Sequence, residues 1–383
     1  MEYRLEELFD LQMGKTPARN NPRYWGTTDN KWISIADLSK CGKYIKETKE
    51  YLSDVAIAES GISQIPANTV IMSFKLSIGK TAITYEPMYS NEAIMSFRDK
   101  HFIDLLPEYI YYLLVAHNWD EGTNKAVMGK TLNKATLSKV KVHIHPLEKQ
   151  EKIVSILNKL TDAIQEHQQQ LQKLDELIKS RFVEMFGDMI LNPNGWERVM
   201  LGMICDVRDG THDSPKYYME GYPLVTSKNV TGGRIDFTDC SLICEEDYNK
   251  INQRSKVDVG DILMPMIGTV GNPVIVDIDA EFAIKNVALI KFREDAKVVN
   301  IFVKALLKSN YFDATVLSKV RGGTQKFISL GDIRKLELLL PPIGLQYQFV
   351  NFVNQVDKSK VIVQKSLDET QLLFDSLMQK YFG

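Results

Sequence analysis

The stretch Ser180–Gly187, SRFVEMFG, decides how this chain is organised, because it returns as Ser376–Gly383, SLMQKYFG, 196 positions later. Similarity at a fixed separation is the mark of an internal repeat. The same shift relates a proline, a glutamine and a leucine in each copy: Pro146 and Pro342, Gln150 and Gln346, and Leu171 and Leu367.

The repeat extends upstream through most of the chain. Gly14 and Gly210 keep the shift of 196, whereas Ile65–Met72 and Val257–Met264 are 192 positions apart. Such slips are expected where surface loops gain or lose residues. The chain is therefore a tandem duplication, with its join near the turn formers of Asn192–Gly195. A duplicated domain suggests a duplicated ligand, and a DNA duplex read at two half-sites is one such ligand.

The first part of each repeat has the pattern of strands and loops. Short apolar and β-branched runs predict strands, and two longer apolar segments predict a short helix in each repeat. The predicted strands are Lys31–Ile35, Val70–Phe74, Tyr222–Thr226, Ile262–Met264 and Leu336–Leu340, and the predicted helices are Leu106–Ala116 and Val303–Leu307.

The last part of each repeat has the pattern of a long helix. Apolar residues recur at alternating spacings of three and four, which predicts a heptad seam on a helix of about 38 residues, or ~57 Å. Pairing the two helices antiparallel would hold two globular domains at opposite ends of a rod. The seam residues are Ile153, Leu157, Leu160, Ile164, Leu171, Leu174, Ile178, Phe349, Val353, Val356, Leu367 and Phe374.

Polar residues interrupt both seams, at His167, Lys360 and Thr370. They fit positions that set the register of the two helices. They also fit the edge of an incomplete bundle that docks further helices.

These patterns predict an α+β fold with a pseudo-twofold internal repeat. We expect a first recognition domain at 1–146, a central spacer helix at 147–187, a second recognition domain at 188–342 and a C-terminal spacer helix at 343–383. The two globular domains would be joined by two long antiparallel coiled-coil helices.

Composition narrows the class of protein. The 383 residues are 44% hydrophobic and 25% charged, which is typical of folded domains and excludes a disordered chain. No apolar run is long enough to span a membrane, and the start at Met1–Arg4 does not resemble a signal peptide. With four cysteines and no disulfide framework, we expect a cytoplasmic protein. The net charge of −2 argues mildly against nucleic acid, although it can hide local basic loops.

Catalytic and metal-binding motifs are missing. Gly129-Lys130-Thr131 lacks the glycine of a phosphate loop, because Asn124 stands five positions before Gly129. The pairs His143 with His145 and Cys240 with Cys244 each lack a second pair at metal-site spacing. We therefore interpret those four side chains as inert, and we expect no catalytic activity, metal or cofactor in this chain.

At this point the chain resembles the specificity subunits of type I restriction-modification systems. Two recognition domains, each followed by a long helix that opens with Pro-x-x-x-Gln, are the layout of that family. Here the element is Pro146–Gln150 and Pro342–Gln346. Further matching pieces are Ile78–Lys80, Asp209–Pro215 and Gly322–Ser329.

The family usually has Glu before that Gln, and Lys149 and Leu345 stand there instead. Neither repeat of this chain therefore has a carboxylate at that position.

The resemblance implies a bipartite double-stranded DNA target with one half read by each domain. It also implies two methyltransferase subunits, which use S-adenosylmethionine, and a translocating restriction subunit.

In such a chain, lysines and arginines would bind phosphates and polar loop residues would read base edges. We place them in the loops, and we favour Arg321–Lys326 because its glycines let the backbone approach a phosphate. The candidates are Lys15, Arg19, Arg23, Lys75, Lys80, Lys130 and Lys134 in the first repeat and His212, Lys216, Lys228, Asn229, Arg321, Gln325 and Lys326 in the second.

Three alternatives stay open. The first is an interaction scaffold, in which the coiled rod is the function and the globular ends bind proteins. The second is a metal-dependent nuclease with scattered carboxylates. The third is the specificity subunit of a related bifunctional restriction system.

Overall fold

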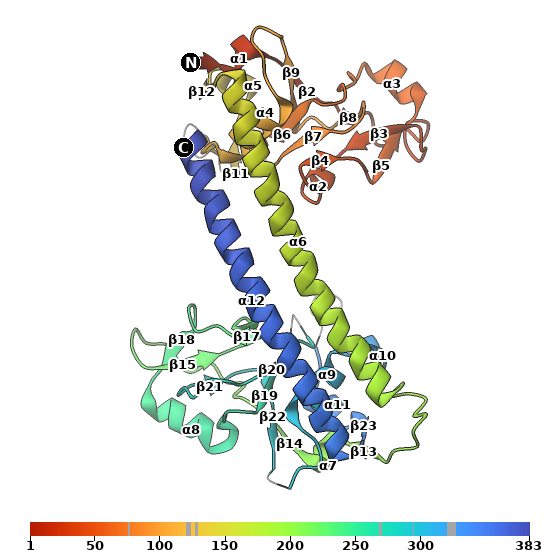
Figure 1. The fold of residues 1–383 in the computed structure, drawn as a ribbon, viewed down its shortest axis with the longest axis vertical. Coiled ribbons are helices and arrows are strands. Elements are labelled where there is room, and N and C mark those ends of the chain that lie inside the picture. Colours follow the sequence, from red (N-terminus) through yellow and green to blue (C-terminus); the bar gives the residue numbers. More distant parts are fainter. Residues whose placement is uncertain (76, 120–123, 127–128, 268–269, 294, 320–326) are drawn as a thin grey trace. The chain divides into compact units, whose positions relative to one another are not determined.

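The computed structural model describes residues 1–75, 77–119, 124–126, 129–267, 270–293, 295–319 and 327–383, and it forms two compact units (Figure 1). Unit 1 contains Met1–Gln168 together with Lys365–Gly383, and unit 2 contains Gln169–Gln364. Each unit thus combines one globular domain with pieces of both long helices. No helix in the described residues is long and apolar enough to cross a membrane.

Unit 1 is built on a five-stranded sheet of order β2-β9-β6-β7-β4 and a three-stranded sheet of order β5-β3-β8, counted over the described residues. Its strands are β1 Glu2–Arg4, β2 Phe9–Met13, β3 Asn30–Ile33, β4 Tyr44–Ile45, β5 Glu50–Leu52, β6 Val70–Ser73, β7 Thr81–Thr84, β8 Tyr89–Ser90, β9 Ile94–Asp99, β10 Asn124–Ala126, β11 Gly129–Thr131 and β12 Lys141–His143. Its short helices are α1 Leu5–Leu8, α2 Ile35–Leu38, α3 Asp54–Ser60, α4 Pro107–Ala116 and α5 Lys134–Ser138.

Unit 2 repeats this topology. Its sheet order β14-β22-β19-β20 reproduces β2-β9-β6-β7, and β18-β15-β21 reproduces β5-β3-β8. The strands are β13 Arg198–Met200, β14 Cys205–Asp209, β15 Tyr222–Val225, β16 Val230–Thr231, β17 Arg234–Ile235, β18 Ser241–Ile243, β19 Ile262–Pro265, β20 Val274–Ile275, β21 Ala283–Ile284, β22 Val287–Phe292 and β23 Glu337–Leu339. The helices are α7 Leu201–Ile204, α8 Glu245–Ser255, α9 Asn300–Leu307, α10 Asn310–Thr315, the 3-10 turn η1 Leu317–Lys319 and α11 Leu330–Arg334.

The mixed fold class and the internal repeat are therefore confirmed. The strand expected at Lys31–Ile35 is wrong at its end, because Ile35 begins α2. Ser34 explains this difference. Its hydroxyl accepts a hydrogen bond from the Asp37 amide, while the Asp37 carboxylate accepts one from the Ser34 amide. This capping box makes Ser34 the N-cap and begins α2 at Ile35, the last residue of the predicted strand.

Two 40-residue helices, α6 (Leu147–Phe186) and α12 (Ile343–Phe382), carry the predicted seams. All twelve seam residues are buried or half-buried. In unit 2 the helix segments run antiparallel, since Asp175 pairs with Lys360 while Phe186 packs on Phe349. The Lys360 ammonium lies 2.8 Å from the Asp175 carboxylate, so this interruption of the seam is an interhelical ion pair.

The glutamine of each Pro-x-x-x-Gln element anchors the first turn of its helix. Gln150 is buried, accepts a hydrogen bond from the Leu106 amide and donates to the carbonyls of Asp104 and His145. Gln346 is buried and makes the same three kinds of bond, to Val299, Lys297 and Pro341. Each helix is thereby fixed to the segment that leads into α4 or α9.

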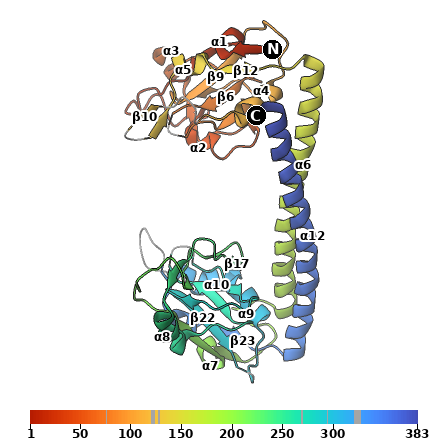
Figure 2. The same cartoon turned by 90° about the vertical axis from the view of Figure 1, so that its left-hand side faces the viewer.

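Each domain core is completed by the end of the other repeat's helix. Figure 2 shows the end of α12 beside α4 in unit 1, where the rings of Phe382 and Tyr109 are 5.3 Å apart. In unit 2 the Phe186 ring, at the end of α6, lies 4.8 Å from the Phe302 ring of α9. The two repeats therefore exchange their helix ends.

Candidate nucleic-acid interface

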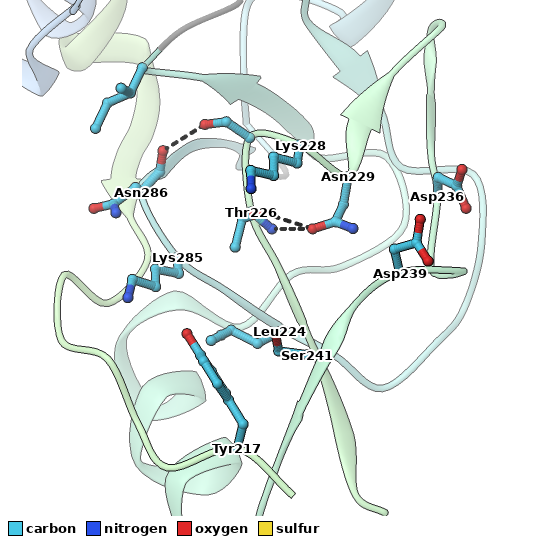
Figure 3. Close-up of a pocket in the computed structure, with 12 residues that line it drawn as sticks. Tyr217, Leu224, Thr226, Lys228, Asn229, Asp236, Asp239, Ser241, Lys285 and Asn286 are labelled. Atoms are coloured by element: carbon cyan, nitrogen blue, oxygen red, sulfur yellow. Dashed lines mark hydrogen bonds between the residues drawn. The ribbon is translucent and has the colours of Figure 1, made fainter. Parts of the chain in front are cut away.

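Unit 2 contains a pocket of about 620 Å³ beside the end of β15 (Figure 3). Lys228 and Lys285 line it on one side, Asp236 and Asp239 lie on another wall, and the ring of Tyr217 borders it. The pocket therefore offers donors, acceptors and an aromatic face within one unit. Such a set suits a polar, planar ligand edge that both donates and accepts hydrogen bonds.

Asn229 holds the turn that shapes this pocket. Its Oδ1 accepts hydrogen bonds from the amide and the hydroxyl of Thr226, at 3.0 and 2.8 Å. The Asn229 residue is 6% exposed, and its Nδ2 is not among the enclosed side-chain atoms of the described residues that lack a hydrogen-bond partner. In Figure 3 this Nδ2 points toward the wall that carries Asp236 and Asp239. Asn229, one of the residues predicted to read DNA, is thus buried. Its Oδ1 holds the turn and its Nδ2 faces the pocket.

The two aspartates of the pocket, Asp236 and Asp239, come directly after the β16–β17 hairpin in the sequence. Gly232 and Gly233 both have positive φ, as a tight two-residue hairpin turn requires. The Asp236 carboxylate then accepts hydrogen bonds from the amide and the hydroxyl of Thr238, which lower the pKa of Asp236. Asp239 has no hydrogen bond or ion pair with any described residue, so its carboxylate is available to a ligand.

A close contact between two backbone segments positions Lys285 and Asn286, which also line the pocket. The Thr211 amide donates to the Ile284 carbonyl, and a Cβ on Gly210 would lie 2.0 Å from that carbonyl oxygen. In unit 1 a Cβ on Gly14 would lie 2.2 Å from the Ser90 carbonyl oxygen. Only glycine allows these contacts, which explains why both repeats have glycine there.

His212 lies against Asn286, which is in the turn that follows β21. Its two ring nitrogens face Oδ1 of Asn286 at 2.8 Å and the Asp209 carboxylate at 2.7 Å. These hydrogen bonds, first to Asn286 and then to Asp209, raise the pKa of His212. Arg254 also pairs with the buried Asp209. Because both ring nitrogens are engaged within the chain, His212 braces the turn after β21.

In unit 1 the predicted arginines are paired with carboxylates. Arg19 forms a two-pronged ion pair with Glu50. Its guanidinium carbon also lies 3.9 Å from the centre of the Trp25 ring and 4.7 Å from that of Trp32. Arg23 pairs with Glu59 at 2.9 Å. The positive charge of both arginines is therefore partly neutralised by a carboxylate. Arg19 also packs against two tryptophan rings.

Among the other candidates Lys15 lies with the two arginines, because its carbonyl accepts from the Trp32 indole and its ammonium contacts Ser60, next to Glu59. Lys15 donates to the Ser60 carbonyl, Lys80 donates to the Ser39 hydroxyl and Lys216 lies over the Tyr218 ring. Lys75 lies over Phe74. Lys134 begins α5 and Lys130 belongs to β11, so the prediction that these two residues lie in loops is wrong. Arg321, Gln325 and Lys326 lie outside the described residues. These assignments as DNA contacts stay predictions.

Sequence reasoning missed Tyr217, Lys285 and the two aspartates of the pocket. A repeated tetrapeptide could have indicated Tyr217, because Pro215-Lys216-Tyr217-Tyr218 corresponds to Pro22-Arg23-Tyr24-Trp25 in the first repeat. The aspartates and Lys285 have no such signal. They come from separate loops that only the sheet pairing brings together.

No group of three or more metal-ligating side chains is present in the described part of the chain. The rings of His143 and His145 are 4.9 Å apart, and Nδ1 of His145 lies 2.9 Å from the Tyr109 hydroxyl. Burial lowers the pKa of His145. Burial raises the pKa of the Cys240 thiol to about 11, which makes it a poor nucleophile at neutral pH.

Comparison with known families identifies the class of protein that combines this repeated domain with two long helices. The family model of the type I restriction modification DNA specificity domain matches residues 1–176 and 193–370. The chain therefore belongs to the specificity subunits of type I restriction-modification systems. These subunits recognise DNA and do not catalyse the reactions of the complex.

Individual relatives support this placement. The chain is similar to the type I restriction enzyme MjaIX specificity subunit of Methanocaldococcus jannaschii, at 24% identity over 98% of this chain and 91% of that protein. It is similar to the EcoBI specificity subunit of Escherichia coli, at 21% identity over 75% and 65% of the two chains. The S subunit of M. genitalium has the same fold, with a TM-score of 0.57 and 14% identity, over 100% of this chain and 96% of that one.

Proposed function

We propose that each of the two recognition domains reads one half of a bipartite double-stranded DNA target. The observation that supports this most is the reproduced topology, since two copies of one sheet arrangement place different loops in equivalent positions. A shared frame with differing loops suits two related but distinct half-sites. This chain would position two methyltransferase subunits, which use S-adenosylmethionine, and a restriction subunit on that target.

Exposed apolar side chains on the long helices support the docking of partner subunits. Ile156, Leu372 and Leu373 are exposed in unit 1, as are Leu177, Val361 and Ile362 in unit 2. A two-helix pair cannot cover both faces of helices that carry this much apolar surface. We therefore extend the hypothesis of an incomplete bundle and place helices of the methyltransferase subunits on these faces.

The test is co-purification with candidate methyltransferase subunits, followed by mapping of methylated adenines on genomic DNA. A complex that marks one bipartite sequence supports the proposal. Exchange of the pocket loop 226–241 for its counterpart in unit 1 should then change one half of that sequence. An unchanged target after the exchange would contradict the assignment of base reading to the loops.

The competing scaffold hypothesis draws on the mildly acidic pI of 6.4 and on the carboxylates that pair with Arg19 and Arg23. It predicts that DNA affinity is absent or insensitive to salt. DNA binding through phosphates instead weakens steeply as the salt concentration rises. A titration of the purified complex at two salt concentrations separates the two hypotheses.

A further inference from the structure

The pocket of unit 2 is lined by two polar groups that complement each other. Nδ2 of Asn229 is a donor on a side chain that is 6% exposed, with its Oδ1 already occupied by Thr226. Asp239 is an acceptor with no hydrogen bond or ion pair to any described residue. The Asn229 Nδ2 is not one of the enclosed atoms without a partner in the described residues, and it faces the pocket, so it is placed to donate to a ligand that supplies an acceptor.

The edges of DNA bases differ in how they match this pair. In the major groove adenine presents the N7 acceptor beside the N6 amino donor, and cytosine presents the N4 amino donor. Guanine and thymine present acceptors, which a carboxylate repels. A carboxylate acceptor beside an amide donor therefore selects a base that presents an amino group in the major groove.

The other walls fit the surroundings of such a base. Lys228 and Lys285 bring positive charge to the pocket, where the phosphates that flank a bound base would lie (Figure 3). Lys285 is oriented by its hydrogen bond to the Ser214 hydroxyl. The pocket thus separates charges of opposite sign, as a site for one nucleotide of a duplex requires.

We propose that this pocket reads, from the major groove, one base that presents an amino group there, adenine or cytosine, in one half-site. Asp239 accepts from the exocyclic amino group, and Nδ2 of Asn229 donates to N7 if the base is adenine, or to O6 of the paired guanine if the base is cytosine. Asp236, held by Thr238, supplies the second negative charge that excludes guanine and thymine. This inference rests on the proposed function and names the class of base that the second domain selects.

The experiment uses the full chain in complex with its co-purified methyltransferase and a library of randomised duplexes. Wild type should select one bipartite sequence. Asp239→Asn replaces the acceptor by an amide of the same shape and should reduce the preference for one base about tenfold or more, at one position of one half. Asn229→Asp keeps the oxygen that Thr226 needs, removes the donor, and should reduce preference at the same position.

Asp279→Asn is the matched control. It changes the same charge at an exposed aspartate in unit 2 that does not line the pocket, and it should leave every position unchanged. Thermal melting of each variant shows whether it folds. Base analogues tested on wild type need no variant at all: purine in place of adenine, or 2-pyrimidinone in place of cytosine, removes the amino group, and the analogue that weakens binding identifies the base.

The outcomes are distinct. If Asp239→Asn and Asn229→Asp fold and select every base as wild type does, the pocket does not read the base and the inference is overturned while the proposed function stands. The same holds if no analogue weakens binding of the selected sequence. If wild type itself selects no sequence, the proposed function fails and the inference fails with it.

Discussion

The ring of Phe382, the penultimate residue of the chain, lies 5.3 Å from the ring of Tyr109 in the first repeat. Phe186, the counterpart of Phe382, packs in the same way on Phe302 of the second repeat. Neither domain core is complete within its own repeat. Each core therefore depends on a residue that lies far along the sequence.

This dependence predicts a local loss of stability in the Phe186→Ala variant. Phe186 is fully buried, and removing a buried phenylalanine ring costs about 3–5 kcal/mol. Hydrogen exchange should speed up in β19 and β22 of unit 2 and stay unchanged in β6 and β9 of unit 1. Leu191→Ala, at a residue that is 78% exposed, is the control and should change neither. Equal loss of protection in both units would contradict the assignment of Phe186 to the core of unit 2.

The glutamine anchors predict a second stability effect. Gln346→Met keeps the size of the side chain but leaves the Val299 amide and the carbonyls of Lys297 and Pro341 unpaired. Unfolding in denaturant should show a loss of about 1–3 kcal/mol for unit 2. Gln355→Met changes an exposed glutamine of the same helix and should cost much less. Similar losses in the two variants would mean that the anchor bonds do not stabilise the fold.

The ion pairs of unit 1 predict that removing a carboxylate strengthens DNA binding. In Glu50→Gln, Arg19 loses its neutralising partner but keeps its contacts with Trp25 and Trp32. If the proposed function is right, DNA affinity should rise and the salt dependence should steepen by about one released counterion. Glu166→Gln makes the same charge change on the helix of unit 1 and serves as the control. Equal effects of the two changes would show that Arg19 does not contact phosphate.

The bracing histidine predicts a pH dependence for unit 2. Its folded-state pKa is raised by Asn286 and Asp209 above the ordinary value near 6.5. The stability that His212 contributes is fully present below that ordinary value and is lost as the pH rises through the raised pKa. Denaturant unfolding between pH 5.5 and 9 should show this loss in wild type and not in His212→Gln. Parallel profiles of the two proteins would rule out His212 as the source.

Much of the fold could be predicted from the sequence because its signals are long. The heptad seam persists over each helix, and the repeat relates widely separated residues at nearly one shift. Short-range chemistry overrode a prediction only locally, where the Ser34–Asp37 capping box turned Ile35 into a helix start.

The candidate site could be predicted only in part. Its donors and acceptors come from separate loops, so nothing in the local sequence of Asp239 or Lys285 indicates that they share a pocket. The charge of Arg19 and Arg23 predicts phosphate contacts, yet Glu50 and Glu59, which pair with them, stand 31 and 36 positions away. A charge pattern along the chain does not show which charges meet in space.

The anchors of Gln150 and Gln346 have an evolutionary consequence. Both side chains bond to main-chain groups alone, so they are indifferent to which side chains the domain carries. Substitutions in the loops can accumulate over generations without touching the attachment of the domain to its helix. A lineage of such proteins can thus acquire new targets by changing a few codons, while the glutamine that fixes each domain to its helix stays the same.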